Sequence, residues 1–151
     1  MDTIEGTTAQ TAQTAQTAQT AQTAQTADED AITRTIEDYF LGWYDGDVAR
    51  MTRALHPALA KRGHFAAPDP AIVHPVTAAQ MIEWTAAGRG RRGDPAQRTF
   101  SVEVDEVHET IATARVHSVP YREYLHLART ADGWRIVNAL WTYPHGIAPG
   151  S

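Results

Sequence analysis

Residues 121–141, "YREYLHLARTADGWRIVNALW", decide the fold class more than any other stretch of this chain. Apolar and polar side chains alternate on both sides of Ala131-Asp132-Gly133. An Asp-Gly pair between two alternating runs is typical of a β-hairpin turn. The stretch therefore predicts two antiparallel strands.

The second of these strands has apolar residues on both faces. One row is Trp134, Ile136 and Leu140, and the other is Val137, Ala139 and Trp141. In an antiparallel sheet with one solvent-exposed face, apolar and polar residues would alternate along the strand instead. One row is expected to pack on helices. The other needs a second cover, which predicts a homodimer formed through the outer sheet face.

The chain before this hairpin changes from helical to strand periodicity. Apolar residues recur at helical spacing over about 28–44, 48–55 and 77–87, with Asp47 and Thr77 as expected N-caps. His56-Pro57 is expected to end the second helix. Residues 58–76 are expected to form a hairpin-like pair of short strands or an irregular loop. Alternation then predicts strands near 100–104 and 112–116. Helices followed by antiparallel strands indicate an α+β fold.

Six copies of Thr-Ala-Gln run from Thr8 to Gln25. The repeat holds no large apolar side chain to bury, and β-branched threonine opposes helix formation. Residues 1–27 are therefore predicted to be a disordered tail, either inert or a partner-binding arm. Residues 28–145 are predicted to form the domain, and 146–151 a flexible C-terminus.

The composition argues against several function classes. The net charge of −5 disfavours nucleic acid as a partner, and the chain has no cysteine for disulfides or thiolate metal sites. No apolar run is long enough to span a membrane. The seven histidines lack metal-site spacing, and no phosphate-binding glycine loop occurs. We predict a cytoplasmic protein with no metal and no cofactor.

Two separated blocks resemble one known family. "YFLGWYDGDVARMTRALHPALAKRGHF", residues 39–65, and the hairpin of residues 121–141 are similar to the putative lumazine-binding family of the nuclear transport factor 2-like superfamily. The resemblance implies three helices packed on a strongly bent, mainly antiparallel sheet, a cone-shaped or cystatin-like fold. It also implies an interior pocket and, often, a homodimer. Such pockets serve isomerases, dehydratases, cyclases and proteins without catalysis, so function must be argued from the site.

Several residues could line such a pocket. The aromatic side chains of Tyr39, Trp43 and Trp84 fit either a pocket wall or a plain core. His56 either caps a helix C-terminus, which favours the protonated imidazole, or lines the pocket. The arginines at 89, 91, 92 and 98 form a basic loop, which is either solvated or an anion-binding lid.

Glu123 and Asn138 are polar residues in apolar rows, so each needs a partner or faces a cavity. Tyr121 shares the face of Glu123. An extended "KRGHF" segment would place Arg62 and His64 on one face, either of a solvated edge strand or of the pocket, where one could hold an anion and the other move a proton. We predict His64 and Glu123 as an acid–base pair, with Tyr121, Arg62 and Asn138 among the ligand-binding residues.

Three functions remain open at this level. The first is binding of a small organic ligand, and the second is cofactor-independent acid–base catalysis on such a ligand. The third is a non-catalytic, homodimeric protein-association module.

Overall fold

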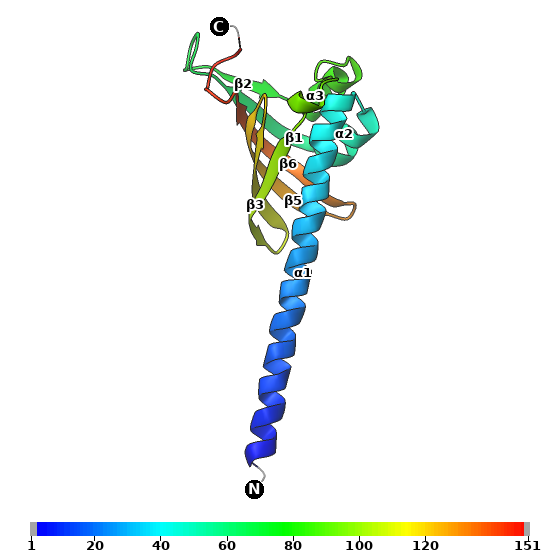
Figure 1. The fold of residues 1–151 in the computed structure, drawn as a ribbon, viewed down its shortest axis with the longest axis vertical. Coiled ribbons are helices and arrows are strands. Elements are labelled where there is room, and N and C mark those ends of the chain that lie inside the picture. Colours follow the sequence, from blue (N-terminus) through cyan, green and yellow to red (C-terminus); the bar gives the residue numbers. More distant parts are fainter. Residues whose placement is uncertain (1–2, 150–151) are drawn as a thin grey trace.

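Helices and strands segregate in the computed structural model, which describes residues 3–149 (Figure 1). The helices are α1 (Thr3–Asp45), α2 (Val48–Ala54) and α3 (Ala78–Ala86), with a 3₁₀ turn at Pro95–Gln97. The strands are β1 (Leu55–His64), β2 (Val73–Val76), β3 (Phe100–His108), β4 (Ile111–Ser118), β5 (Arg122–Thr130) and β6 (Gly133–Thr142).

The strands form one curled sheet in the order β2-β1-β6-β5-β4-β3. All neighbours are antiparallel except β1 and β6, which pair in parallel. The α+β fold with three helices on a bent, mainly antiparallel sheet is therefore confirmed. The hairpin-like pair expected in residues 58–76 is formed by β1 and β2. Strand β1 is longer than predicted, and its other edge pairs with β6.

The C-terminal half of α1 packs on the concave side of the sheet. Ile32, Ile36 and Phe40 lie at helical spacing and are at most 2% exposed. Phe40 stacks on Phe100 of β3 with ring centroids 5.0 Å apart. The helix ends where Gly46 takes a φ of +67°, a conformation that favours glycine. Asp47 then caps α2, as predicted.

Helix α1 begins far earlier than predicted. The sequence indicated a start at Asp28–Asp30, whereas the structure has helix from Thr3. That residues 1–27 form a disordered tail stays a prediction. Within the repeat, the hydroxyl of each threonine from Thr14 to Thr26 donates to the carbonyl four residues earlier. Once residues 28–45 are folded, each added residue gains a backbone bond without a new nucleation cost. Propagation of this kind accounts for the extra turns.

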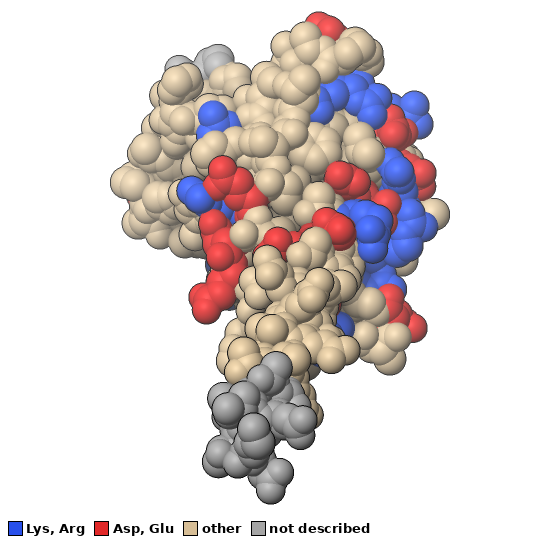
Figure 2. Space-filling model, turned by 60° about the horizontal axis from the view of Figure 1, so that its bottom comes forward, with Lys and Arg blue, Asp and Glu red and all other residues tan. Residues whose placement is uncertain are grey.

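The repeat makes no part of the core. Residues 10–27 are exposed, and the helix projects away from the sheet (Figure 1). Residues 10–27 contain no charged side chain, and the projecting helix that Figure 2 draws in colour is uniformly tan. Its separation from the domain as an independent segment stays a prediction.

The end of the second helix differs from expectation. Helix α2 stops at Ala54, and His56-Pro57 belongs to β1. The pairing of β1 with β6 shifts register between Leu55 and Ala60. Proline is tolerated there because an irregular stretch of strand requires no ladder hydrogen bond from it.

Strand β6 contains a bulge that the alternation did not reveal. Its pairing with β5 shifts between Leu127↔Ile136 and His126↔Asn138, so Val137 is the extra residue. One inserted residue moves every later side chain to the opposite face. The inner row is therefore Ile136, Ala139 and Trp141, while Asn138 and Leu140 point outward, contrary to prediction.

The described part of the C-terminus contacts the domain. The Gly146 carbonyl accepts from Ala66 N at 2.8 Å, and Pro149 reaches the cavity described below. Residues 1–2 and 150–151, which belong to the two predicted tails, lie outside the described residues. Among residues 3–149, no helix is long and apolar enough to cross a bilayer.

Candidate functional site

A cavity of about 490 Å³ lies between the helices and the concave side of the sheet. Its wall comes from α1, α3 and the loop after α3, from strands β1, β2, β5 and β6, and from the segments just before β5 and after β6. The lining residues are Tyr39, Phe40, Trp43, Lys61, Val76, Met81, Trp84, Arg89, Arg92, Tyr121, Glu123, Trp141, Tyr143 and Pro149. Seven of them are aromatic, so most of the wall is flat and apolar.

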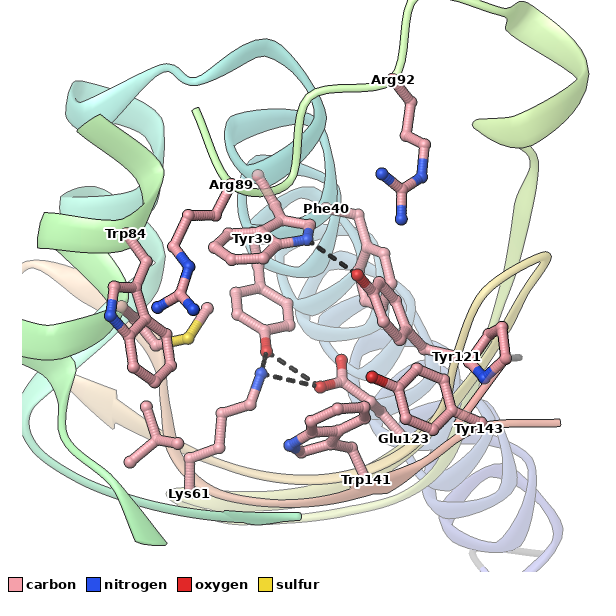
Figure 3. A pocket seen from close by; sticks show the side chains of 14 residues that line it. Tyr39, Phe40, Lys61, Trp84, Arg89, Arg92, Tyr121, Glu123, Trp141 and Tyr143 are labelled. Atoms are coloured by element: carbon pink, nitrogen blue, oxygen red, sulfur yellow. Dashed lines mark hydrogen bonds and ion pairs between the residues drawn. The ribbon is translucent and has the colours of Figure 1, made fainter. Parts of the chain in front are cut away.

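Three polar side chains meet in this wall (Figure 3). The Tyr39 hydroxyl donates to Glu123 Oε1 at 2.9 Å, and Lys61 Nζ lies 3.1 Å from the same oxygen. Lys61 Nζ also donates to the Tyr39 hydroxyl. All three residues are buried, at 3%, 8% and 3% exposure for Tyr39, Lys61 and Glu123. A buried ion pair is tolerated only when further hydrogen bonds accompany it, and Tyr39 supplies them.

Strand alternation places two of these groups. In β1, Leu59, Lys61 and Gly63 point inward, and in β5, Glu123 points inward with Leu125. Gly63 leaves room for the Trp141 indole, because a Cβ at this glycine would lie 2.8 Å from Trp141 Nε1. The indole in turn lies over Lys61, with Nζ 5.5 Å from the ring centroid.

The phenol of Tyr39 keeps its proton to a higher pH than an exposed tyrosine does. Burial raises its pKa well above the ordinary value, and the negative charge of Glu123 raises it further. Burial also raises the pKa of Tyr121, while the hydrogen bond from Trp43 Nε1 (3.2 Å) opposes that rise. Both phenols are therefore neutral donors at physiological pH.

Two arginines reach the cavity from the loop that follows α3 (Figure 3). The Arg89 guanidinium lies 4.5 Å from the centroid of the Trp84 ring, a cation–π contact. Neither Arg89 nor Arg92 forms an ion pair with a carboxylate among residues 3–149. Gly90 lets the loop pass directly over Trp43, since a Cβ would lie 2.3 Å from the indole. The backbone thus holds two unpaired positive charges beside the cavity.

Five of the nine residues predicted as catalytic or ligand-binding line this cavity: Tyr39, Trp43, Trp84, Tyr121 and Glu123. Helical spacing on α1 and α3, and alternation along residues 121–125, were sufficient to group them by face. What each does to a ligand stays a prediction.

The other four lie elsewhere. His64 is on the opposite face of β1 from Lys61, and its Nε2 contacts the Pro70 carbonyl at 2.8 Å. Arg62 shares that outer face. His56 Nδ1 accepts from Ala58 N at 3.0 Å, and Asn138 contacts His126 on the outer face because of the β6 bulge. The structure therefore does not bring His64 next to Glu123.

Lys61 was overlooked, although the sequence held a signal for it. It is the only lysine in the chain, against twelve arginines. The same alternation that put Arg62 and His64 on one face put Lys61 and Gly63 on the other. The choice of the inward face required the register with β6, in which Lys61 pairs with Ala139. Among the described residues, no group of three His, Asp or Glu is close enough to hold a metal.

The comparisons with known proteins agree with this architecture. Residues 27–142 match the family model described as "Putative lumazine-binding". The chain belongs to this family. Comparison with curated proteins found no significant match.

Solved structures place the putative lumazine-binding chain among nuclear transport factor 2-like folds. An NTF-2-like protein of unknown function from Silicibacter pomeroyi superposes with a TM-score of 0.64 at 15% identity, covering 79% of this chain and 98% of that one. An NTF2-like protein with a cystatin-like fold from Novosphingobium aromaticivorans gives 0.59 at 17% identity, covering 89% and 91%. At such identities the likeness establishes the fold alone.

Proposed function

We propose that the cavity binds a small, flat, negatively charged organic molecule. The observation that carries this proposal is an aromatic wall that holds two unpaired arginines beside a buried Lys61–Tyr39–Glu123 cluster. Membership of the putative lumazine-binding family favours a ligand-binding role in general terms.

The shape of the wall favours a conjugated ligand. Trp84, Trp43 and Tyr121 present ring faces and edges to a space of about 490 Å³. That volume is in the range of small-molecule sites, which are typically apolar with a few convergent polar groups. A planar ring system gains contact with aromatic side chains at a low entropic cost.

The charge of the lining favours an anion. Lys61, Arg89 and Arg92 are basic, and Glu123 is the only acidic lining residue. Because Lys61 and Glu123 neutralise each other, both guanidinium charges remain for a ligand. Arginine is well suited to hold a carboxylate through paired hydrogen bonds.

The polar cluster also supplies groups for proton transfer. Both of the contacts from Tyr39 and Lys61 are made to Glu123 Oε1. The other oxygen, Oε2, accepts no hydrogen bond from any described residue, and Figure 3 shows it turned away from Lys61 and Tyr39. Glu123 could therefore accept a proton from a bound molecule through Oε2, with the neutral Tyr39 as donor. The proposal therefore includes acid–base catalysis, in which Lys61 rather than His64 is the partner of Glu123.

The test compares an aromatic anion with its neutral amide. Calorimetric titration with naphthoate should show saturable binding to the wild-type protein, and naphthamide should bind more weakly. The double variant Arg89→Gln/Arg92→Gln should lose at least about tenfold in naphthoate affinity, which corresponds to about 1.4 kcal/mol. Its affinity for naphthamide should not change. Equal binding of both ligands by both proteins would refute the anion preference, and no saturable binding would refute the site. Native mass spectrometry of the purified protein would identify a retained ligand.

A homodimer is the second part of the proposal. Tyr124 and Leu140 are cross-strand neighbours on the outer face and are 60% and 49% exposed. A second copy of this face would cover both, as isologous interfaces do. The β6 bulge makes this face less apolar than predicted, because Asn138 lies there too. Light scattering should give a dimer mass for the wild type and a monomer mass for Tyr124→Arg; a monomeric wild type would remove the proposal.

A further inference from the structure

The only lysine of the chain is buried in the wall of the cavity. Twelve of the thirteen basic residues are arginine. Arginine is effectively always protonated, whereas a lysine amine can lose its proton and act as a nucleophile. Lys61 is 8% exposed, yet it lines the cavity. An ion pair that only had to stabilise the fold could equally have used arginine.

We infer that Lys61 forms an imine with a carbonyl compound bound in the cavity. The inference goes beyond the proposed function, on which it rests for the ligand's fit. The substrate class is an aromatic or conjugated aldehyde or ketone that also carries an anionic group. Lys61 would hold the carbonyl end, while Arg89 or Arg92 holds the anionic group.

The neighbours of Lys61 Nζ can move the protons that this step requires. Glu123 Oε1 lies 3.1 Å from Nζ, and the Tyr39 hydroxyl bridges the two, accepting from Nζ and donating to Oε1. The rings of Tyr39 and Trp141 lie 5.0 and 5.5 Å from Nζ, where they stabilise a cation. An iminium ion at Nζ would keep the same positive charge in the same place.

The step balances without any further reactant. When a ligand displaces water, the ammonium of Lys61 gives one proton to Glu123, which removes two buried charges at once. The neutral amine attacks the carbonyl carbon, a C–N bond forms, and a proton passes from nitrogen to oxygen through Tyr39. The carbinolamine hydroxyl then takes the proton from Glu123 and leaves as water. The products are the iminium of Lys61, the carboxylate of Glu123 and one water molecule.

Borohydride trapping tests the inference on the full chain. The protein is incubated with para-formylbenzoate, an aromatic aldehyde with a carboxylate, and then reduced. The adduct adds the mass of the probe less one oxygen atom. Peptide mapping distinguishes Lys61 from the α-amino group of the expressed chain, which is the only other amine. We expect labelling of Lys61 in the folded protein at least tenfold faster than in the same protein unfolded in urea.

Three variants separate chemistry from folding. Lys61→Arg keeps the charge and the donors, and should abolish the internal adduct while circular dichroism stays unchanged. Glu123→Gln and Tyr39→Phe should each slow labelling at least tenfold. Lys61 that labels no faster in the folded than in the unfolded chain would overturn the inference, as would labelling confined to the terminal amine. If naphthoate still binds in that case, the proposed function stands without the imine.

Discussion

Helix α1 contains two segments with the same backbone conformation and opposite environments. From Asp28 to Asp45 it is fixed to the sheet by buried side chains, and by Thr35 Oγ1, which donates to the Trp134 carbonyl at 2.9 Å. From residue 10 to 27 it is exposed, and the threonine hydroxyls from Thr14 to Thr26 donate to carbonyls of the same helix. Figure 1 shows both segments as one continuous rod.

The comparison shows that a segment can be helical without contributing to the stability of the domain. Local hydrogen bonds and good helix formers such as Ala and Gln suffice to continue a helix. Most of the free energy that holds a helix in a protein comes from packing an amphipathic face, which only the segment from Asp28 to Asp45 has. The predictions below ask how large that difference is.

The largest expected effect is the loss of a core side chain in the packed segment. Phe40→Ala should reduce the free energy of unfolding by about 3–5 kcal/mol, because it removes a 2%-exposed ring stacked on Phe100. Gln19→Ala in the exposed segment is the matched control and should change it by less than about 0.5 kcal/mol. Urea denaturation measures both. If Phe40→Ala does not fold, Ile36→Val should still cost about 0.5–1.5 kcal/mol.

A smaller effect is expected from the titration of Tyr39. Its pKa is raised in the folded state, so the unfolded chain loses this proton at lower pH. The protonated Tyr39 therefore makes its full contribution to the free energy of unfolding below the unfolded-state pKa of about 10. This contribution is lost as the pH rises above that value. Between about pH 9 and 11, wild-type stability should fall more steeply than that of Tyr39→Phe, by up to about 1.4 kcal/mol per pH unit. Equal slopes in urea titrations would contradict the burial of this hydroxyl.

Deleting residues 1–27 should have almost no effect on stability. Residues 10–27 are exposed and bury nothing in the domain, so the melting midpoint should stay within about 2 °C. Differential scanning calorimetry of the full and shortened chains checks this. A drop of many degrees would mean that the repeat supports the domain.

The smallest effect concerns local opening within α1. Amide hydrogens of the exposed segment should exchange almost as fast as in a free peptide, whereas those near Ile36 and Phe40 should be protected close to the global limit. Exchange followed by mass spectrometry resolves the two segments. Similar protection in both would show that the repeat has a stabilising partner.

Much of the site followed from sequence periodicity, because a side chain's direction in a helix or strand depends on local geometry. The helical spacing of Tyr39 and Trp43 and the alternation of Tyr121 and Glu123 placed all four correctly on inward faces. Alternation failed for Asn138, since the β6 bulge inverts the faces after Ile136 and leaves no mark in the sequence. His64 was predicted to face the cavity, but Lys61 does so instead, for a different reason. Alternation groups residues by face but does not say which face is inside.

The amino-acid sequence by itself indicated the three helices, the strands after residue 100, the α+β class and the family, since hydrophobic period, caps and turns are local properties. Only the tertiary structure decided that Lys61, Tyr39 and Glu123 meet, because they come from three elements and join through the parallel β1–β6 pair. Contacts between residues far apart in the chain depend on register and sheet curvature, which no single segment encodes.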